Sequence, residues 1–114
     1  MLIAVATSSG QEVDLHFGKT STFAVFDVDQ QTSRPLKKVE VAQYCTSDPA
    51  HTEHAQRFSA IAKALKDCRA VICVQIGDLP RMSLAKEGIQ AFTAQGAVEA
   101  ALRNAFVLLS AGGC

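Results

Sequence analysis

The chain has 114 residues, of which 48% are hydrophobic and 19% charged, and eleven Lys and Arg residues balance eleven Asp and Glu residues. This composition indicates a single domain over residues 1–114 and excludes a disordered chain, and the zero net charge disfavours a duplex nucleic-acid binder. No apolar run approaches the ~20 residues of a membrane span, and no basic leader precedes the apolar start, so we expect a cytoplasmic protein without membrane partners.

The first half of the chain is predicted to be rich in strands. Residues 1–7 form an apolar, β-branched run that ends at a Ser-Ser-Gly turn, which is typical of a buried strand. Residues 23–28 predict a second strand. Residues 36–41 alternate between apolar and charged side chains, which predicts a third strand at a sheet edge. The short polar link between the second and third strands favours an antiparallel hairpin.

The hydrophobic period changes in the second half, after the polar loop 45–51. Apolar residues then recur every three or four positions, which predicts a helix. The predicted elements are a helix, a strand, a helix, a strand and a helix, which begin near residues 52, 70, 80, 89 and 96. The order β-β-β-α-β-α-β-α predicts an α/β fold with a ribonuclease-H-like, mixed five-stranded sheet flanked by three helices. We expect the strand 70–74 to be central and the strand 36–41 to lie at an edge.

The sequence gives little support to an enzyme. Nucleases of the ribonuclease-H-like architecture hold two metal ions on acidic residues of the first strand, and residues 2–6 contain no acid. Neither a phosphate-binding loop nor a nucleophile elbow occurs. We therefore expect no catalytic residues, and a phosphodiester hydrolase is the less favoured alternative.

The four cysteines form no Cys-x-x-Cys pair, which argues against a zinc ribbon or a thioredoxin-type motif. Cys73 lies inside the apolar strand 70–74, so it is expected to be a core residue. Cys45 and Cys114 lie in polar or glycine-rich surroundings, so their thiols are available for other roles.

The loop 8–22 is long for a link between two strands, and such loops are usually functional or disordered. It holds His16 beside Phe17 and Gly18. A neutral imidazole is a good ligand for iron and other transition metals, although a solvated surface histidine would fit the same residues. We expect this loop to make few apolar contacts and to be mobile until a ligand binds.

A second group of ligand-type side chains lies at the junction between a loop and a helix. Cys45, His51 and His54 gather one thiol and two imidazoles within ten residues. Sulfur and imidazole ligands suit iron–sulfur or copper–sulfur clusters. The spacing matches no zinc-finger pattern, and solvated loop histidines are an equal alternative.

The turn after the strand 70–74 opens a helix. Gly77 permits close approach of the backbone, Pro80 fits the first helical turn, and the amide groups there favour an anion, with Arg81 adding positive charge. A purely structural turn would have the same sequence. If the strands 1–7 and 70–74 are adjacent and parallel, this turn and the His16 loop emerge at the same sheet edge.

Together, these segments resemble a known family from residue 1 to about residue 104. The His16-Phe17-Gly18 loop, the Gly77-x-x-Pro80-Arg81 turn and the strand that starts at Gly88-Ile89 are similar to those of the dinitrogenase iron–molybdenum cofactor biosynthesis family. The resemblance implies a ribonuclease-H-like fold and a non-enzymatic carrier or storage role in cofactor biosynthesis for nitrogen fixation. The implied cargo is a transiently bound metal–sulfur cluster, of iron, molybdenum and sulfur or of molybdenum, copper and sulfur.

The resemblance also implies which residues contact the cluster. It points to His16 as the principal ligand, and the other matching positions are Phe17, Gly18, Gly77, Pro80 and Arg81. Cys45 lies in a segment that carries a cysteine in some members, and His51 and His54 are auxiliary ligands on chemical grounds alone. The expected partners are donor and acceptor proteins of cofactor assembly, and we expect a monomer or weak dimer. A metal-free regulatory or interaction domain that docks a partner through these loops is the alternative.

Overall fold

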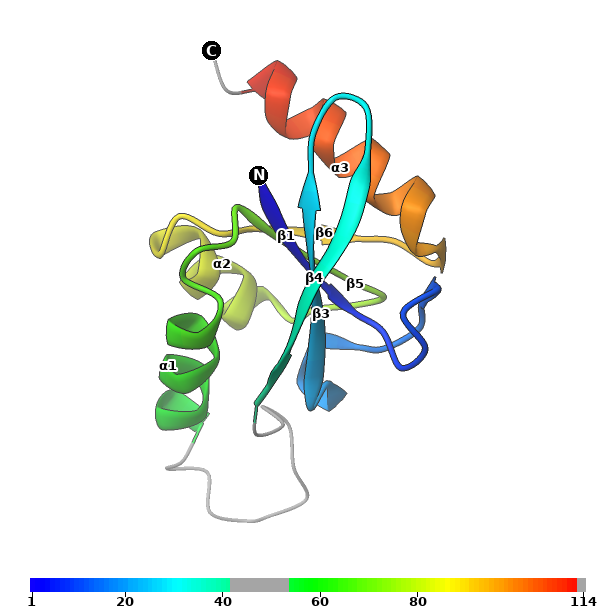
Figure 1. The fold of residues 1–114 in the computed structure, drawn as a ribbon. Coiled ribbons are helices and arrows are strands. Elements are labelled where there is room, and N and C mark those ends of the chain that lie inside the picture. Colours follow the sequence, from blue (N-terminus) through cyan, green and yellow to red (C-terminus); the bar gives the residue numbers. More distant parts are fainter. Residues whose placement is uncertain (42–53, 113–114) are drawn as a thin grey trace.

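The computed structural model describes residues 1–41 and 54–112, with only the backbone described at 54–58 and 111–112 (Figure 1). Its main sheet is built from Leu2–Ala6 (β1), Thr22–Val28 (β3), Ser33–Glu40 (β4), Ala70–Cys73 (β5) and Gln90–Thr93 (β6). A two-stranded ribbon pairs Glu12–Val13 (β2) with Gly96–Ala97 (β7). The helices are His54–Ala64 (α1), Asp78–Lys86 (α2) and Val98–Gly112 (α3), with a 3-10 turn at Phe17–Lys19 (η1).

The five strands of the main sheet lie in the order β4-β3-β1-β5-β6. β1 pairs parallel with β5 and antiparallel with β3, whereas β4 is antiparallel to β3 and β6 is parallel to β5. The strands β1, β4, β5 and β6 therefore all end at the same edge of the sheet, which we call the C-terminal edge. The predicted ribonuclease-H-like mixed sheet is confirmed, and so is the edge position of the third predicted strand. β5 is interior and fully buried, as predicted, but the middle strand is β1.

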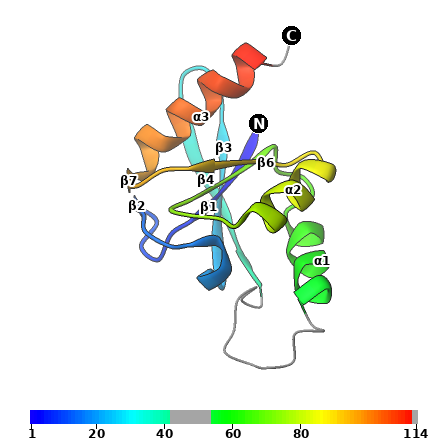
Figure 2. The ribbon, with the colours of Figure 1, turned by 180° about the vertical axis from the view of Figure 1, so that it is seen from behind.

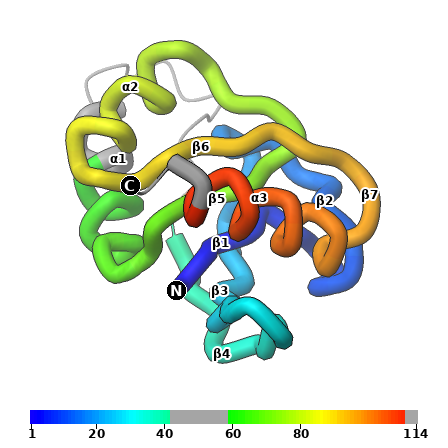
Figure 3. The backbone as a smooth tube through the Cα atoms, turned by 90° about the horizontal axis from the view of Figure 1, so that it is seen from above, coloured from blue at the N-terminus to red at the C-terminus, as the bar shows by residue number. Residues whose placement is uncertain are grey.

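Helices cover both faces of the sheet. α1 and α2 lie together on one face and α3 lies on the other (Figures 2 and 3). The stripe predicted for the last helix faces the sheet: Val98, Leu102, Ala105 and Leu109 are at most 7% exposed, and Ala101 and Phe106 are partly buried. Although α3 is apolar over much of its length, none of the helices within the described residues is long and apolar enough to cross a bilayer.

Two boundaries differ from the prediction for local reasons. β4 begins at Ser33 and includes Pro35, which a strand tolerates at a sheet edge because the missing N–H needs no partner there. The last helix begins at Val98 rather than Gly96, because Gly96 has a φ of +102° that an α-helix does not allow. α2 begins at Asp78, so Pro80 lies in its first turn as predicted, and Gly88, with a φ of +80°, follows its end.

Two core thiols make stability sensitive to alkaline pH. Desolvation by burial raises the pKa of Cys68 and of Cys73 from 9.0 to about 11. A group whose pKa is raised by folding stabilises the fold below its unfolded pKa, and that contribution is lost as the pH rises through the folded pKa. We therefore expect the free energy of unfolding to fall between about pH 9 and about pH 11.

Urea unfolding of the wild type and of Cys68→Ala at about pH 8 and about pH 10.5 checks this expectation. The variant should lose less stability over that interval than the wild type, because it lacks one of the two buried thiols. The lysines that titrate in the same interval are common to both proteins and cancel in the comparison. An equal loss in the two proteins would contradict the assignment to Cys68.

Candidate functional site

The loops that follow β1 and β5 lie side by side at the C-terminal edge. The N–H of Phe17 donates to the carbonyl of Gln75 at 2.9 Å, and the N–H of Val74 donates to the carbonyl of Leu15 at 2.9 Å. These two hydrogen bonds extend the parallel pairing of β1 and β5 beyond the strands themselves. The prediction that the His16 loop and the Gly77 turn emerge at one sheet edge is thereby confirmed.

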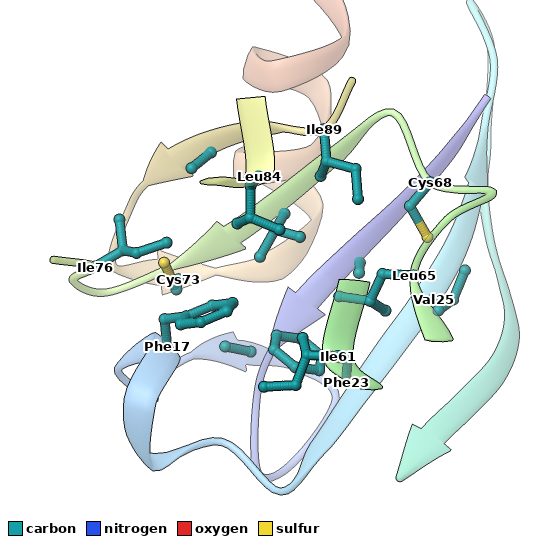
Figure 4. Close-up of a cluster of buried hydrophobic side chains, with 14 residues drawn as sticks. Phe17, Phe23, Val25, Ile61, Leu65, Cys68, Cys73, Ile76, Leu84 and Ile89 are labelled. Carbon is teal, nitrogen blue, oxygen red and sulfur yellow. The ribbon is translucent and has the colours of Figure 1, made fainter. Parts of the chain in front are cut away.

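The loop 8–22 is anchored by its own apolar residues, so the prediction that it makes few apolar contacts is wrong. Val13 and Phe17 are each 1% exposed. Val13 packs in the cluster beneath α3, and Phe17 packs in the cluster beneath α1 and α2 (Figure 4). The ring of Phe17 lies 6.0 Å from that of Phe23. The elements in this loop, β2 and η1, have two and three residues, which is too short to produce a recognisable hydrophobic period.

A pocket of about 280 Å³ lies where the two loops meet. It is lined by residues 16–19 of the first loop and by residues 75–77 and Pro80 of the second. We call it the histidine pocket. The residues that the sequence predicted as cluster contacts and that line it are His16, Phe17, Gly18, Gly77 and Pro80. Lys19, which was not among the predicted contacts, also lines it and contributes an ammonium group.

Arg81, the sixth predicted contact, does not line the histidine pocket. Successive residues of a helix are rotated by about 100° around its axis, so Arg81 turns away from the side on which Pro80 lies. Its Nη1 lies 3.5 Å from the carbonyl oxygen of Ala91 in β6, to which it donates a hydrogen bond. Among the described residues that line the pocket, Lys19 is therefore the one with a cationic side chain.

The backbone of His16 is fixed while its imidazole is exposed. His16 precedes η1 in an extended conformation. The hydroxyl of Thr20, which is wholly buried, donates to the carbonyl of His16 at 2.7 Å, and the N–H of Lys19 donates to the same carbonyl at 3.0 Å. An imidazole on a fixed backbone can accept a ligand from solvent without ordering a loop first.

Thr20→Val removes the buried hydroxyl and keeps the side-chain shape. We expect the free energy of unfolding to fall by about 1 kcal/mol, the net value of one hydrogen bond, and the amide signals of residues 16–19 to shift. Thr20→Ser, which keeps the hydroxyl, should leave those signals close to their wild-type positions. Urea unfolding and amide NMR spectra check both variants; equal shifts in the two would mean that the hydroxyl does not hold His16.

The first turn of α2 faces the pocket without a side-chain cap. Gly77 is the N-cap, so it offers no side-chain oxygen to the amide groups of this turn. Its φ of −69° suits any residue, and an added Cβ would meet Pro80 only at 3.6 Å, an ordinary contact. The fold itself therefore does not require glycine here. The missing side chain leaves the amide groups of this turn without a side-chain cap, although Pro80 has no N–H and the carboxylate of Asp78 adds a negative charge there.

The second predicted group of ligands is not placed by the structure. Cys45 and His51 lie outside the described residues, and His54 is described only as the backbone start of α1. β4 runs in the same direction as β1, so the chain leaves β4 at the C-terminal edge. Within residues 1–41 and 54–112, no three His, Cys, Asp or Glu side chains gather in a way that could hold a metal ion.

The fold and the pocket define a class of small α/β domain, with a solvent-open pocket at the ends of two adjacent parallel strands. Comparison with known proteins gives the family. A sequence model described as dinitrogenase iron-molybdenum cofactor matches residues 1–106. The chain belongs to this family, and the resemblance found in the sequence is confirmed.

Curated relatives in this family are FeMo cofactor biosynthesis proteins. The chain is 35% identical over 91 residues to NifB of Klebsiella pneumoniae, which covers 78% of this chain and 19% of that protein. It is 36% identical over 90 residues to NifB of Azotobacter vinelandii, covering 79% of this chain and 18% of that protein. The chain thus spans about a fifth of the length of the curated relatives that it matches.

Two solved structures share the fold. PH0822 superposes with a TM-score of 0.66 at 21% identity, over 94% of this chain and 89% of that one. The protein mj0327 of Methanocaldococcus jannaschii gives a TM-score of 0.57 at 16% identity, over 95% of this chain and 88% of that one. At these identities the likeness shows the fold alone.

Proposed function

We propose that this domain binds and carries a metal–sulfur cluster during iron–molybdenum cofactor biosynthesis or storage, and that the cluster occupies the histidine pocket. One observation carries the proposal: the His16 loop and the Gly77 turn, which are far apart in the sequence, line a single pocket. Membership of the iron–molybdenum cofactor family and the names of the curated relatives support the nature of the cargo.

The residues of the pocket suit a large anionic cluster. The exposed imidazole of His16 supplies a nitrogen ligand of the kind that binds iron, copper and related metals. The ammonium group of Lys19 and the uncapped amide end of α2 attract negative charge. Among its described lining residues the pocket offers one imidazole and no thiolate, and a site with so few ligands holds a cluster through few bonds, which favours release to an acceptor.

The proposal includes the partners and the cellular setting. A carrier receives its cluster from a donor protein and passes it to an acceptor of cofactor assembly, and it needs no catalytic residue. The cluster is iron–molybdenum–sulfur or molybdenum–copper–sulfur, held transiently. The setting is the cytoplasm, whose reducing conditions keep thiols free.

A metal-free interaction domain is the second candidate, and one observation favours it. Leu79 and Met82 lie one helical turn apart on α2 and are 69% and 60% exposed. They lie on the helix whose first turn lines the histidine pocket. Exposed apolar side chains at such a place suit contact with another protein, whether or not a cluster is bound.

Anaerobic reconstitution separates the two candidates. The full chain is incubated with iron, sulfide and molybdate, or with Cu(I) and tetrathiomolybdate, desalted, and examined for visible absorption and metal content. The carrier proposal predicts a coloured, metal-containing protein, weaker binding by Lys19→Gln, and unchanged binding by Arg81→Gln, which removes the same charge outside the pocket. A colourless, metal-free wild type, or equal losses in the two variants, would argue against the proposal.

A further inference from the structure

A second and larger pocket, of about 790 Å³, lies at the C-terminal edge of the sheet. Two cross-strand pairs, Thr22–Glu40 and Ala24–Lys38, contribute to its lining from β3 and β4. Ala24 belongs to the cluster beneath α3, so this pocket and α3 lie on the same face of the sheet. The histidine pocket includes Phe17, which packs on the opposite face.

The course of α3 explains why this part of the face is uncovered. α3 starts beside β7 and runs past the tip of the β3–β4 hairpin, where Arg103 donates to the carbonyl of Thr32 at 2.6 Å (Figure 1). Thr22 and Glu40 lie at the other end of the hairpin. Among the described helices, α3 therefore does not cover the sheet surface between these two residues and the end of β1.

Four residues with hydroxyl side chains and two lysines are among those that line the pocket: Thr7, Ser8, Ser21, Thr22, Lys19 and Lys38. We call it the hydroxyl pocket. Within residues 1–41 and 54–112, neither lysine has a carboxylate within ion-pair distance. Lysines without a counter-ion, beside several O–H donors, supply the kinds of groups that bind an oxyanion.

The hydroxyl groups are not equally available to a ligand. Ser8 already donates its hydroxyl hydrogen to the carboxylate of Asp14 at 2.5 Å. The Thr7 hydroxyl accepts a hydrogen bond from the N–H of Gly10 at 2.9 Å, which leaves its own hydrogen to donate. The hydroxyls of Ser21 and Thr22 have no hydrogen-bond partner in the described part of the chain. Three O–H donors and the ammonium group of Lys38 thus remain for a ligand, and Lys19 is shared with the histidine pocket.

We propose that the hydroxyl pocket binds an oxyanion, either free or as the charged group of a larger molecule. The inference is independent of cluster binding in the histidine pocket, although Lys19 lines both pockets. Glu40 is the one carboxylate among the described residues that line the hydroxyl pocket, and it opposes the binding of highly charged anions. Neutralising Glu40 should therefore strengthen binding, whereas neutralising Lys38 should weaken it.

The test is an NMR titration of the full chain, without cluster, at constant ionic strength. The probes are molybdate, inorganic phosphate and glycerol 3-phosphate. We expect saturable shifts at the amides of Thr7, Ser21 and Thr22. Lys38→Gln should weaken binding about fivefold and Glu40→Gln should strengthen it, whereas Lys37→Gln should change it by less than about twofold.

Lys37 is the matched control because it is the neighbour of Lys38 on the other face of β4. It opposes Val25, a residue of the cluster beneath α1 and α2, and its charge acts on the thiol of Cys68. If molybdate or phosphate binds more tightly than glycerol 3-phosphate, the ligand is a free oxyanion. If glycerol 3-phosphate binds more tightly, the ligand is a larger molecule with a charged group. Either result supports the proposal. No saturable shift with any probe, or equal losses in Lys37→Gln and Lys38→Gln, would overturn it.

Discussion

His16→Ala is expected to weaken cluster binding at least tenfold, which corresponds to about 1.4 kcal/mol, and to leave the free energy of unfolding unchanged. The affinity falls because the variant removes the imidazole from the histidine pocket. Stability is kept because the side chain is exposed and the backbone of His16 is held by Thr20 and Lys19. Anaerobic titration with a preformed cluster measures the affinity, and urea unfolding measures the stability.

The controls remove ligand-type side chains elsewhere in the chain. Cys45→Ser, His51→Ala and His54→Ala each delete one side chain of the segment that the sequence predicted as a secondary source of ligands. We expect each to weaken binding less than His16→Ala does. If His16→Ala binds the cluster as tightly as the wild type, the assignment of His16 fails and this segment becomes the better site.

Phe17→Ala is expected to lower the free energy of unfolding by about 3–5 kcal/mol. Phe17 is 1% exposed and packs against Phe23, so truncation leaves a cavity beneath α1 and α2 (Figure 4). A loss of this size is a large part of the roughly 5–15 kcal/mol that stabilises a typical domain.

Phe17→Leu is the matched control, because it keeps an apolar side chain of similar length and should cost less than about 1.5 kcal/mol. Urea unfolding at neutral pH measures both variants. If Phe17→Ala loses less than about 1 kcal/mol, Phe17 does not anchor the loop, and the loop is mobile as the sequence alone suggested.

The main architecture could be predicted because its elements have clear hydrophobic periods. The strand 70–74 is apolar throughout and is interior, and the strand 36–41 alternates and lies at the edge. The ribbon of β2 and β7 could not be predicted, because each strand has only two residues. The ribbon forms because the 8–22 loop and the start of α3 meet in space. Local sequence does not encode that meeting.

The sequence predicted where the two halves of the histidine pocket meet, but it did not identify Lys19 as a lining residue. The two halves could be brought together from the sequence because the loops after two adjacent parallel strands share an edge. The cation could not be identified in the same way. Arg81 follows Pro80 directly in sequence, but helical rotation directs it to β6, whereas Lys19 reaches the pocket through the tight turn of η1.

In our proposal, the imidazole of His16 binds the metal–sulfur cargo. The most direct measurement is a nitrogen NMR spectrum of histidine-labelled full chain, before and after loading with Cu(I) and tetrathiomolybdate, whose closed-shell metals keep the spectrum sharp. The three imidazoles of the chain, those of His16, His51 and His54, are each assigned by substitution. We expect the ring nitrogens of His16 to shift most on loading. A loaded protein in which the His16 nitrogens keep their positions would contradict it.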